Sequence, residues 1–209
     1  MLDTLPRRRT DTRKRLLDLA EQMVLAKGFA STSIDELIAG VGITKSGFFY
    51  HFRDKNALAR AMLERHIAYD KALLDDIFNR ADELNEDPLH GFLVGLKLFA
   101  EMMAALPEAH PGCLVATLCY QDQLFDRTVH ALNAESVLSW RRRFRARLEL
   151  IAERYPPREP LDLDVLADMV STLVEGGLVM GRALKDPSIL PRQILLFRDF
   201  VRQVFLPRA

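Results

Sequence analysis

Residues 33–52 read SIDELIAGVGITKSGFFYHF, and this stretch decides the fold of the chain. Ser33 followed three residues later by Glu36 matches a capping box, which predicts a helix that begins immediately after the serine. Gly42 interrupts the apolar pattern of that helix and supplies the conformational freedom that a sharp turn requires. Thr44 is a suitable cap for a second helix of about two turns. The stretch therefore predicts two short helices joined by a tight turn.

The second of these helices carries a mixture of small, basic and aromatic residues. Thr44, Lys45 and Ser46 at its start are short or basic, which suits contact with base edges and phosphates. Phe48 and Phe52 are expected to be its inward anchors. Two helices in this layout are typical of a helix-turn-helix, which places its second helix in the major groove of DNA.

Composition and charge are those of a globular protein with an uneven charge distribution. Of 209 residues, 49% are hydrophobic and 28% are charged, and the formal net charge is zero. Residues 1–55 nevertheless hold ten Lys and Arg against seven Asp and Glu, and residues 56–209 hold 19 against 22. Six of the basic residues are Arg7, Arg8, Arg9, Arg13, Lys14 and Arg15. This basic arm fits phosphate contact, although a solvated, disordered terminus has the same composition.

Several classes of protein are disfavoured by what the sequence lacks. No apolar run approaches the length of a membrane span, and no signal peptide is expected at the N-terminus. Two cysteines do not form a disulfide framework, so a reducing cytoplasm is the expected location. Catalytic motifs such as a phosphate loop, HExxH or a nucleophile elbow are missing, so we expect no enzyme, no cofactor and no metal. A metal-responsive protein stays open, because ligands can converge in space.

Helical periodicity dominates the whole chain, and strand patterns are nearly absent. We expect an all-α fold with a three-helix N-terminal domain at residues 1–54 and a six-helix domain at residues 55–209, in which residues 55–81 form a linking helix. Helices are predicted at about residues 10–27, 34–41, 44–51, 55–81, 89–105, 113–121, 124–155, 163–184 and 191–205. The arginine run at residues 141–147 is interpreted as a solvated face with ion pairs inside its helix, rather than as a second nucleic-acid patch.

The N-terminal pattern resembles the TetR/AcrR family of one-component transcriptional regulators. The resemblance covers about 50 positions and is specific in both residue type and spacing. It is carried by Gly28, Thr32-Ser33-Ile34, Ile38-Ala39, Gly42-Ile43-Thr44-Lys45, Gly47, Phe49-Tyr50-His51-Phe52, Lys55 and Leu58. Val41 departs from the family, which usually has alanine there. The C-terminal part resembles the family only in the number and order of its helices.

The resemblance implies a homodimeric DNA-binding regulator. Its expected partners are a double-stranded DNA operator, a second copy of the chain and a small-molecule effector, and its expected action is repression that the effector relieves. An activator, or a nucleoid protein with little sequence preference, remains an alternative. Packing roles are open for Tyr50 and His51. The residues expected to contact DNA are Thr32, Ser33, Thr44, Lys45, Ser46, Gly47, Phe49, Tyr50, His51 and Lys55.

An apolar effector pocket is expected among the helices of the C-terminal part. For any single residue, a place in the core is the alternative. The candidate lining is Phe92, Leu96, Phe99, Met102, Met103, Thr117, Tyr120, Trp140 and Phe144, together with Cys113. Cys113 follows Pro111-Gly112 at a helix start, where a thiolate is favoured, so a thiol-based sensor of oxidants or electrophiles is a second hypothesis. A small buried hydrophobic side chain is the simpler interpretation of this cysteine.

The last two helices resemble the dimer interface of the family. Gly176, Gly177 and Gly181 are costly inside an ordinary helix and suit the close approach of another helix. The alternative is that the same residues pack inside one monomer. The predicted interface consists of Leu166, Val170, Leu173, Val174, Gly177, Met180, Phe197, Val201 and Val204.

Overall fold

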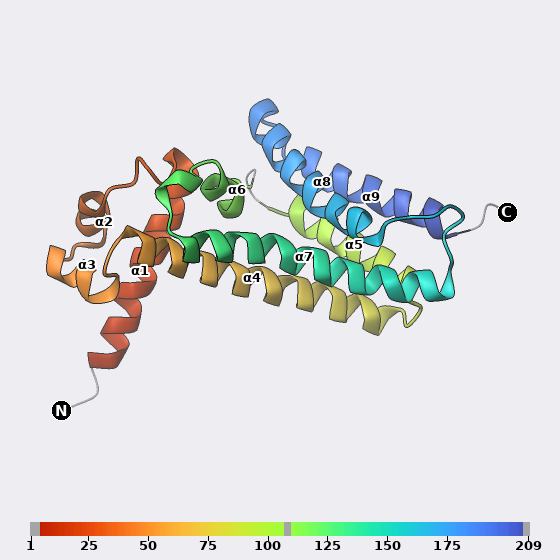
Figure 1. Ribbon diagram of the computed structural model, residues 1–209, viewed down its shortest axis with the longest axis horizontal. Coiled ribbons are helices and arrows are strands. Elements are labelled where there is room, and N and C mark those ends of the chain that lie inside the picture. Colours follow the sequence, from red (N-terminus) through yellow and green to blue (C-terminus); the bar gives the residue numbers. More distant parts are fainter. Residues whose placement is uncertain (1–4, 107–109, 207–209) are drawn as a thin grey trace. The chain divides into compact units, whose positions relative to one another are not determined.

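The computed structural model describes residues 5–106 and 110–206, with side chains from residue 11 onward, and within these ranges every regular element is a helix (Figure 1). This confirms the predicted all-α fold. The elements are α1 (Leu5–Lys27), α2 (Ile34–Val41), α3 (Lys45–His51), α4 (Lys55–Leu84), α5 (Pro88–Ala104), α6 (Leu114–Cys119), the 3₁₀ helix η1 (Asp122–Leu124), α7 (Arg127–Arg154), α8 (Leu163–Leu184) and α9 (Ile189–Phe205). None of the described helices combines the length and the apolar character needed to cross a membrane.

The chain divides into two compact units, and the division differs from the predicted boundary after residue 54. The first unit comprises the chain up to Ala68 together with Cys113–Glu135, and the second comprises Tyr69–Gly112 and Ser136–Ala209. The first unit therefore contains the start of α4, all of α6 and η1, and the start of α7. Sequence order suggested a continuous N-terminal domain, but contacts between distant segments make this unit discontinuous.

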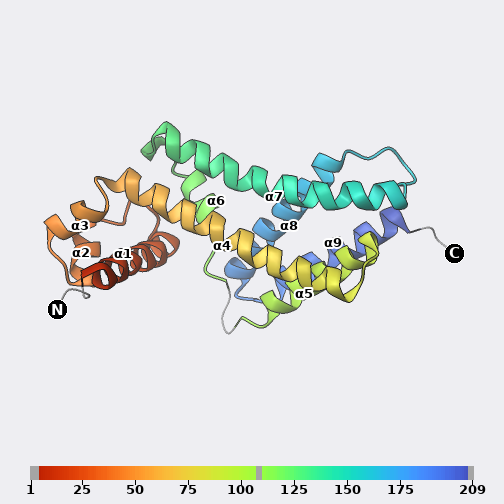
Figure 2. The same ribbon diagram turned by 90° about the horizontal axis from the view of Figure 1, so that it is seen from below.

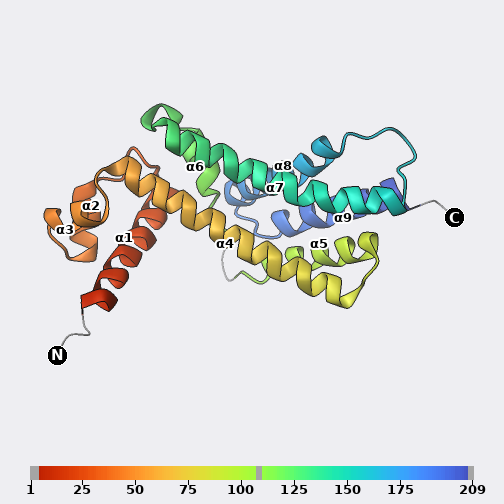
Figure 3. The same ribbon diagram turned by 60° about the horizontal axis from the view of Figure 1, so that its bottom comes forward.

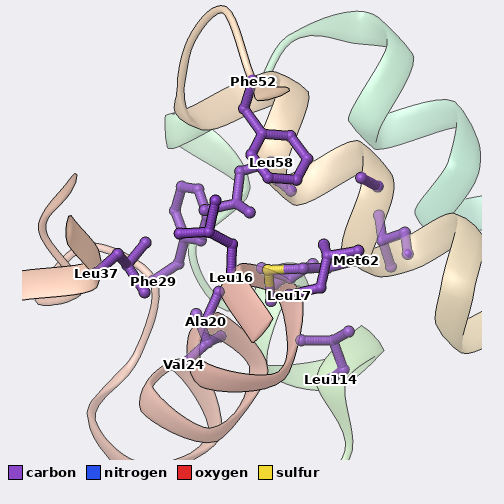
Figure 4. Packing of buried hydrophobic residues seen from close by; sticks show 14 of the residues in the cluster. Leu16, Leu17, Ala20, Val24, Phe29, Leu37, Phe52, Leu58, Met62 and Leu114 are labelled. Atoms are coloured by element: carbon purple, nitrogen blue, oxygen red, sulfur yellow. The ribbon is translucent and has the colours of Figure 1, made fainter. Parts of the chain in front are cut away.

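A single hydrophobic core holds the first unit together (Figure 4). Leu16 and Ala20 of α1 are fully buried against Phe48 of α3 and Met62 of α4 in this cluster. Leu114 of α6 lies in the same core. Leu118 and Val129 extend it with residues that follow more than fifty positions after α3. The helices α1, α2 and α3 thus share their core with later segments.

In the second unit, α9 packs against both α5 and α8, as Figures 2 and 3 show. An aromatic cluster fills the space between the α4, α5 and α7 segments of this unit. The rings of Phe78 and Phe92 stack with centroids 5.7 Å apart, and Phe144 meets both edge-on at 5.8 and 6.1 Å. All three side chains are fully buried, so the centre of this unit is a packed aromatic core.

Arg145 forms the predicted ion pair inside α7, with Glu149, but the arginines of this run pair mainly with other helices, so the prediction was only partly right. Arg141 donates two hydrogen bonds to Asp168 of α8, at 2.8 and 2.6 Å. Arg147 makes a similar bidentate pair with Asp82 of α4, at 2.9 and 2.8 Å. Helical spacing points successive arginines toward α8 and α4 in turn. These partly exposed pairs contribute up to about 1 kcal/mol each.

The shared core of the first unit can be tested at Leu114. Leu114→Ala should lower the free energy of unfolding by about 2–5 kcal/mol, because it removes a fully buried side chain and leaves a cavity. Urea denaturation measures this change. Leu150→Ala removes the same atoms from an exposed position on α7 and should change stability by less than about 0.5 kcal/mol. Equal small effects of both substitutions would show that α6 is not part of the core.

Candidate nucleic-acid interface

The start of α2 is fixed by the capping box that the sequence predicted. Ser33 Oγ accepts the Glu36 N–H at 3.1 Å, and Glu36 Oε2 accepts the Ser33 N–H at 2.9 Å. Lys27 at the end of α1 donates to the other carboxylate oxygen of Glu36. These bonds lower the pKa of Glu36 from 4.5 to about 2, with the Lys27 hydrogen bond as the largest cause. The first turn of α2 is therefore held in place from two directions.

The turn between α2 and α3 has the left-handed geometry that a glycine favours. Gly42 has φ +73° and ψ +43°, and its N–H donates to the Ile38 carbonyl at 2.9 Å. Arg15 of α1 donates to the carbonyl of Val41 at 2.7 Å. Val41 itself is buried, so the valine found in place of the family's usual alanine fills part of the core. The turn is thus anchored to α1 as well as to its own helices.

The short helix α3 presents its polar side outward. Thr44 caps it by accepting the Gly47 N–H at 3.2 Å, as predicted, and its hydroxyl also meets Ser46 Oγ at 2.9 Å. Phe48 is fully buried and anchors the helix in the core. Tyr50 is 66% exposed, on the side of the helix that faces away from this anchor.

The predicted DNA-contacting residues fall into an exposed group and a group engaged within the unit. Exposed side chains are those of Ser33, Thr44, Lys45, Ser46, Phe49 and Tyr50. Gly47 and His51 are half-buried, and the ring of His51 lies edge-on to that of Tyr50 with centroids 5.2 Å apart. The exposed members all come from α3, its cap and the start of α2, so the structure gathers them on neighbouring elements of one unit.

Thr32 and Lys55 are turned toward the protein rather than outward. Thr32 is buried, and its hydroxyl donates to the Gly28 carbonyl at 3.0 Å, while its contact with a phosphate stays a prediction. The Lys55 ammonium donates to the Phe29 carbonyl at 2.9 Å and lies 4.4 Å from the centre of the Phe29 ring. Burial lowers the pKa of Lys55. Both residues therefore hold the α1–α2 turn in this structure.

Part of the predicted basic arm is also built into the domain. The Arg13 guanidinium lies 5.3 Å from the centre of the Phe52 ring, and Arg15 holds the Val41 carbonyl as described above. The backbone is already helical from Leu5, which is earlier than the predicted start near residue 10. The side chains of Arg7, Arg8 and Arg9 lie outside the described residues. Lys14 is exposed on α1.

The predicted effector residues do not come together as one site within either unit. Cys113, Thr117 and Tyr120 belong to the first unit, where Tyr120 is 81% exposed. The remaining candidates belong to the second unit. Phe92, Leu96, Phe99 and Phe144 are buried, and Met102, Met103 and Trp140 are half-buried. The aromatic members pack against one another, with centroids 6.4 Å apart for Phe99–Trp140 and 5.8 Å apart for Trp140–Phe144.

A small cavity lies in the second unit next to one of these candidates. Its volume is about 20 Å³, which is room for about one water molecule. Its lining consists of Met103, Leu106, His110, Gly177, Leu178, Gly181, Arg182, Pro187 and Leu190. Within the described residues, no three His, Cys, Asp or Glu side chains are grouped so that they could hold a metal ion.

Cys113 has a structural role at the start of α6. Its sulfur accepts the Ala116 N–H at 3.5 Å, and its half-buried side chain packs against the core of the first unit. These contacts agree with a small, partly buried side chain. The hypothesis of a thiol sensor stays a prediction.

The predicted dimer residues are mostly part of the core of their own unit. Leu166, Val170, Phe197 and Val201 are buried, so they pack within the monomer, which was the alternative interpretation. Leu173, Val174 and Val204 are half-buried, whereas Met180 is exposed. Gly177 is buried because the first turn of α9 lies against it. A Cβ at Gly177 would lie 3.1 Å from the Leu190 Cα of the same chain.

Some residues shape the site through contacts that the sequence analysis did not predict. Arg15, Lys27 and Gln121 each form a hydrogen bond that fixes a turn or a helix start, and Gln121 reaches the Ala30 N–H across 91 residues. For Lys27, its position at the end of α1 near an expected capping box was a weak hint. For Gln121, nothing local indicates the partner.

Two short helices with a capped, exposed second helix on a small shared core define the class of helix-turn-helix proteins. A family model described as bacterial regulatory proteins of the tetR family matches residues 16–62. The transcriptional repressor NemR of Escherichia coli K12 is 43% identical over 58 residues, which are 28% of this chain and 29% of that protein. A putative regulator of mycofactocin biosynthesis, MftR of Mycobacterium tuberculosis, is 30% identical over 95 residues, or 46% and 47% of the two chains.

The likeness to solved structures covers nearly the whole chain. A TetR-family regulator from Agrobacterium tumefaciens has a TM-score of 0.76 at 18% identity, with 95% of this chain and 100% of that chain covered. The reduced form of E. coli NemR has a TM-score of 0.75 at 20% identity, with 95% and 99% covered. Residues 16–62 therefore match the tetR family model, and the chain has the fold of these TetR-family structures, although the matched sequence spans less than half of the curated relatives.

The acid dependence of the capping box can be tested with Glu36→Gln. The carboxylate has a lower pKa in the folded chain, so its stabilisation is complete above about pH 4.5 and is lost as the pH falls toward about 2. The amide keeps an acceptor for Ser33 but does not titrate. Urea denaturation at several pH values should therefore show a smaller loss of stability between pH 4.5 and 3 for the variant than for the wild type.

Asp35→Asn, which changes the neighbouring exposed carboxylate of the same turn, is the control. Parallel pH profiles for the wild type and Glu36→Gln would contradict the role assigned to this carboxylate.

Proposed function

We propose that this protein is a sequence-specific transcriptional regulator that binds a palindromic operator as a homodimer. A repressor released from DNA by a small apolar effector is the form that the family resemblance favours. Under this proposal the protein acts on DNA in the bacterial cytoplasm. The proposal includes no catalytic activity. The observation that carries the proposal is the exposed, capped helix α3, which lies within the segment, residues 16–62, that matches the tetR family model.

The surface of α3 supports contact with bases. Lys45 and Ser46 are exposed in its first turn, and Tyr50 is exposed one turn later. A lysine and hydroxyl groups provide donors for phosphates and base edges, and the exposed ring of Phe49 provides apolar contact of the kind made with a thymine methyl group. Ser33 lies at the start of α2, where unpaired helical N–H groups attract a phosphate.

An unpartnered apolar face on α8 and α9 supports the homodimer. The face includes the predicted Met180 but otherwise lies mostly at positions next to the predicted ones, which are buried or half-buried. It consists of Val165, Val179, Met180 and Leu184 of α8, and Leu195, Leu196 and Phe200 of α9. Gly176 lies in the same stripe of α8, and a Cβ there would meet no atom within 4 Å. A second copy can therefore approach closely at this glycine.

The effector is proposed to bind within the second unit, close to the aromatic cluster around Phe92 and Trp140. The cluster is apolar, and its charged neighbours on α7 are paired with Asp75, Asp82 and Asp168. A neutral or weakly polar molecule therefore fits better than an ion. Because the aromatic rings fill this region in the present structure, binding requires that some of these side chains move.

Selection of bound fragments from random DNA tests the central proposal. At near-physiological salt, the purified protein should enrich a roughly palindromic site whose half-sites lie about 34–36 Å apart. Tyr50→Ala should weaken binding to the selected operator about tenfold, and Lys45→Ala should lower the slope of log affinity against log salt by about one. Tyr69→Ala removes a similarly exposed tyrosine from α4 and should leave affinity unchanged. Binding without enrichment would favour an architectural protein instead.

The dimer face is tested by sedimentation at micromolar concentration. Leu196→Asp places a charge on the apolar face and should shift the protein from dimer to monomer, because burying an unpaired charge is costly. Leu150→Asp, at an exposed position of α7, should leave the dimer intact. A wild-type protein that sediments as a monomer would exclude this part of the proposal, and a dimeric Leu196→Asp variant would place the interface elsewhere.

A further inference from the structure

The α1–α2 turn of the first unit contains one backbone donor whose partner comes from far along the chain. Within the turn, the Gly28 N–H donates to Val24, and the Thr32 N–H donates to the Phe29 carbonyl at 3.2 Å. The Ala30 N–H instead donates to Oε1 of Gln121 at 2.9 Å. Gln121 lies between α6 and η1, so a segment distant in sequence completes the hydrogen bonding of this turn.

The fit between Gln121 and the turn is close. A Cβ at Gly28 would lie 2.6 Å from Nε2 of Gln121, so a larger residue at position 28 would force the Gln121 side chain to move. Gly28 also has φ +83°, in the left-handed region that favours glycine. Gly42 has a similar φ of +73°, but a Cβ there would meet nothing within 4 Å. The two glycines therefore have the same backbone requirement, and only Gly28 has the additional contact with Gln121.

Two further contacts fix the segment that carries Gln121. The ring of Phe125 lies against that of Phe29 with centroids 4.8 Å apart. The Asp126 N–H donates to Oδ1 of Asn56, at the start of α4, at 3.1 Å. The segment that carries Gln121 is therefore tied to both the turn and the start of α4.

We infer that Gln121 is a positioning residue for DNA binding: its amide oxygen holds the α1–α2 turn and thereby sets the start of α2. The turn leads directly from Ala30 to Ser33, the cap of α2 and a candidate phosphate contact. Loss of the Gln121 oxygen frees the Ala30 N–H and lets the turn sample other conformations. The inference rests on the proposed function, since it names a residue that prepares the DNA-binding surface without touching DNA.

The test compares Gln121→Met, Gln121→Glu and Gln123→Met in the full-length protein. Methionine has a similar length but no amide oxygen, whereas glutamate keeps an acceptor for the Ala30 N–H. Gln123→Met makes the same change at an exposed position in η1. Hydrogen exchange of the Ala30 amide by NMR reports the turn, and fluorescence anisotropy with the selected operator reports affinity.

Gln121→Met should speed exchange at Ala30 and weaken operator binding about two- to tenfold, as expected for the loss of one hydrogen bond. Gln121→Glu should keep exchange at Ala30 slow, because the carboxylate can still accept the Ala30 N–H. Gln123→Met should match the wild type in both measurements. Unchanged exchange at Ala30 in Gln121→Met would overturn the inference. So would faster exchange with unchanged operator affinity.

A second comparison applies if Gln121→Met fails to fold. Gly28→Ala should weaken operator binding less in a Gln121→Ser background than in the wild type, because the shorter side chain removes the clash and leaves only the backbone strain. Additive effects would overturn the inference. Failure of the proposed function is distinguished separately: the wild type would then select no DNA site, while exchange at Ala30 would still report whether Gln121 holds the turn.

Discussion

The helices α1, α2 and α3 span residues 5–51, a length at which a hydrophobic core is marginal, and later segments of the first unit enlarge that core. Its core is completed by Leu58 and Met62 from α4 and by Leu114 and Leu118 from α6. Because these residues are fully buried with those of α1 and α3, the position of the exposed helix α3 depends on segments outside the helix-turn-helix. The discontinuous unit reflects this shared core, and the contact of Gln121 with the α1–α2 turn is a second link between the same segments.

Local signals predicted the parts of the site that local interactions determine. The capping box at Ser33, the left-handed turn at Gly42 and the cap at Thr44 each involve partners within three or four residues. Such bonds have a fixed spacing in the sequence, so their pattern is visible without a structure. The all-α class and most helix bounds were predictable for the same reason, because helical periodicity is also local.

Contacts between distant segments could not be predicted from spacing. The partner of Gln121 lies 91 residues away, and Asp168, the partner of Arg141, lies on another helix. The dimer residues show a subtler difficulty. A helix with apolar residues on two sides has two surfaces that can pack, and the sequence does not show which of them meets the core of its own chain. Leu166 faces that core, whereas the adjacent residue Val165 is 65% exposed. A shift of one position along the helix is therefore enough to move a side chain from one face to the other.

The closed second unit constrains how an effector can act. The stacked rings of Phe78 and Phe92 and the edge-on ring of Phe144 leave no room for a drug-sized molecule among themselves. An effector at this place therefore favours a different packing, and it shifts the protein only by its difference in affinity for the two packings. The paired arginines of α7 favour two distinct packings over a continuous range, since each bidentate contact is either formed or broken. Both α4 and α7 contribute residues to the two units, and the same helices carry Asn56 and Val129 of the first.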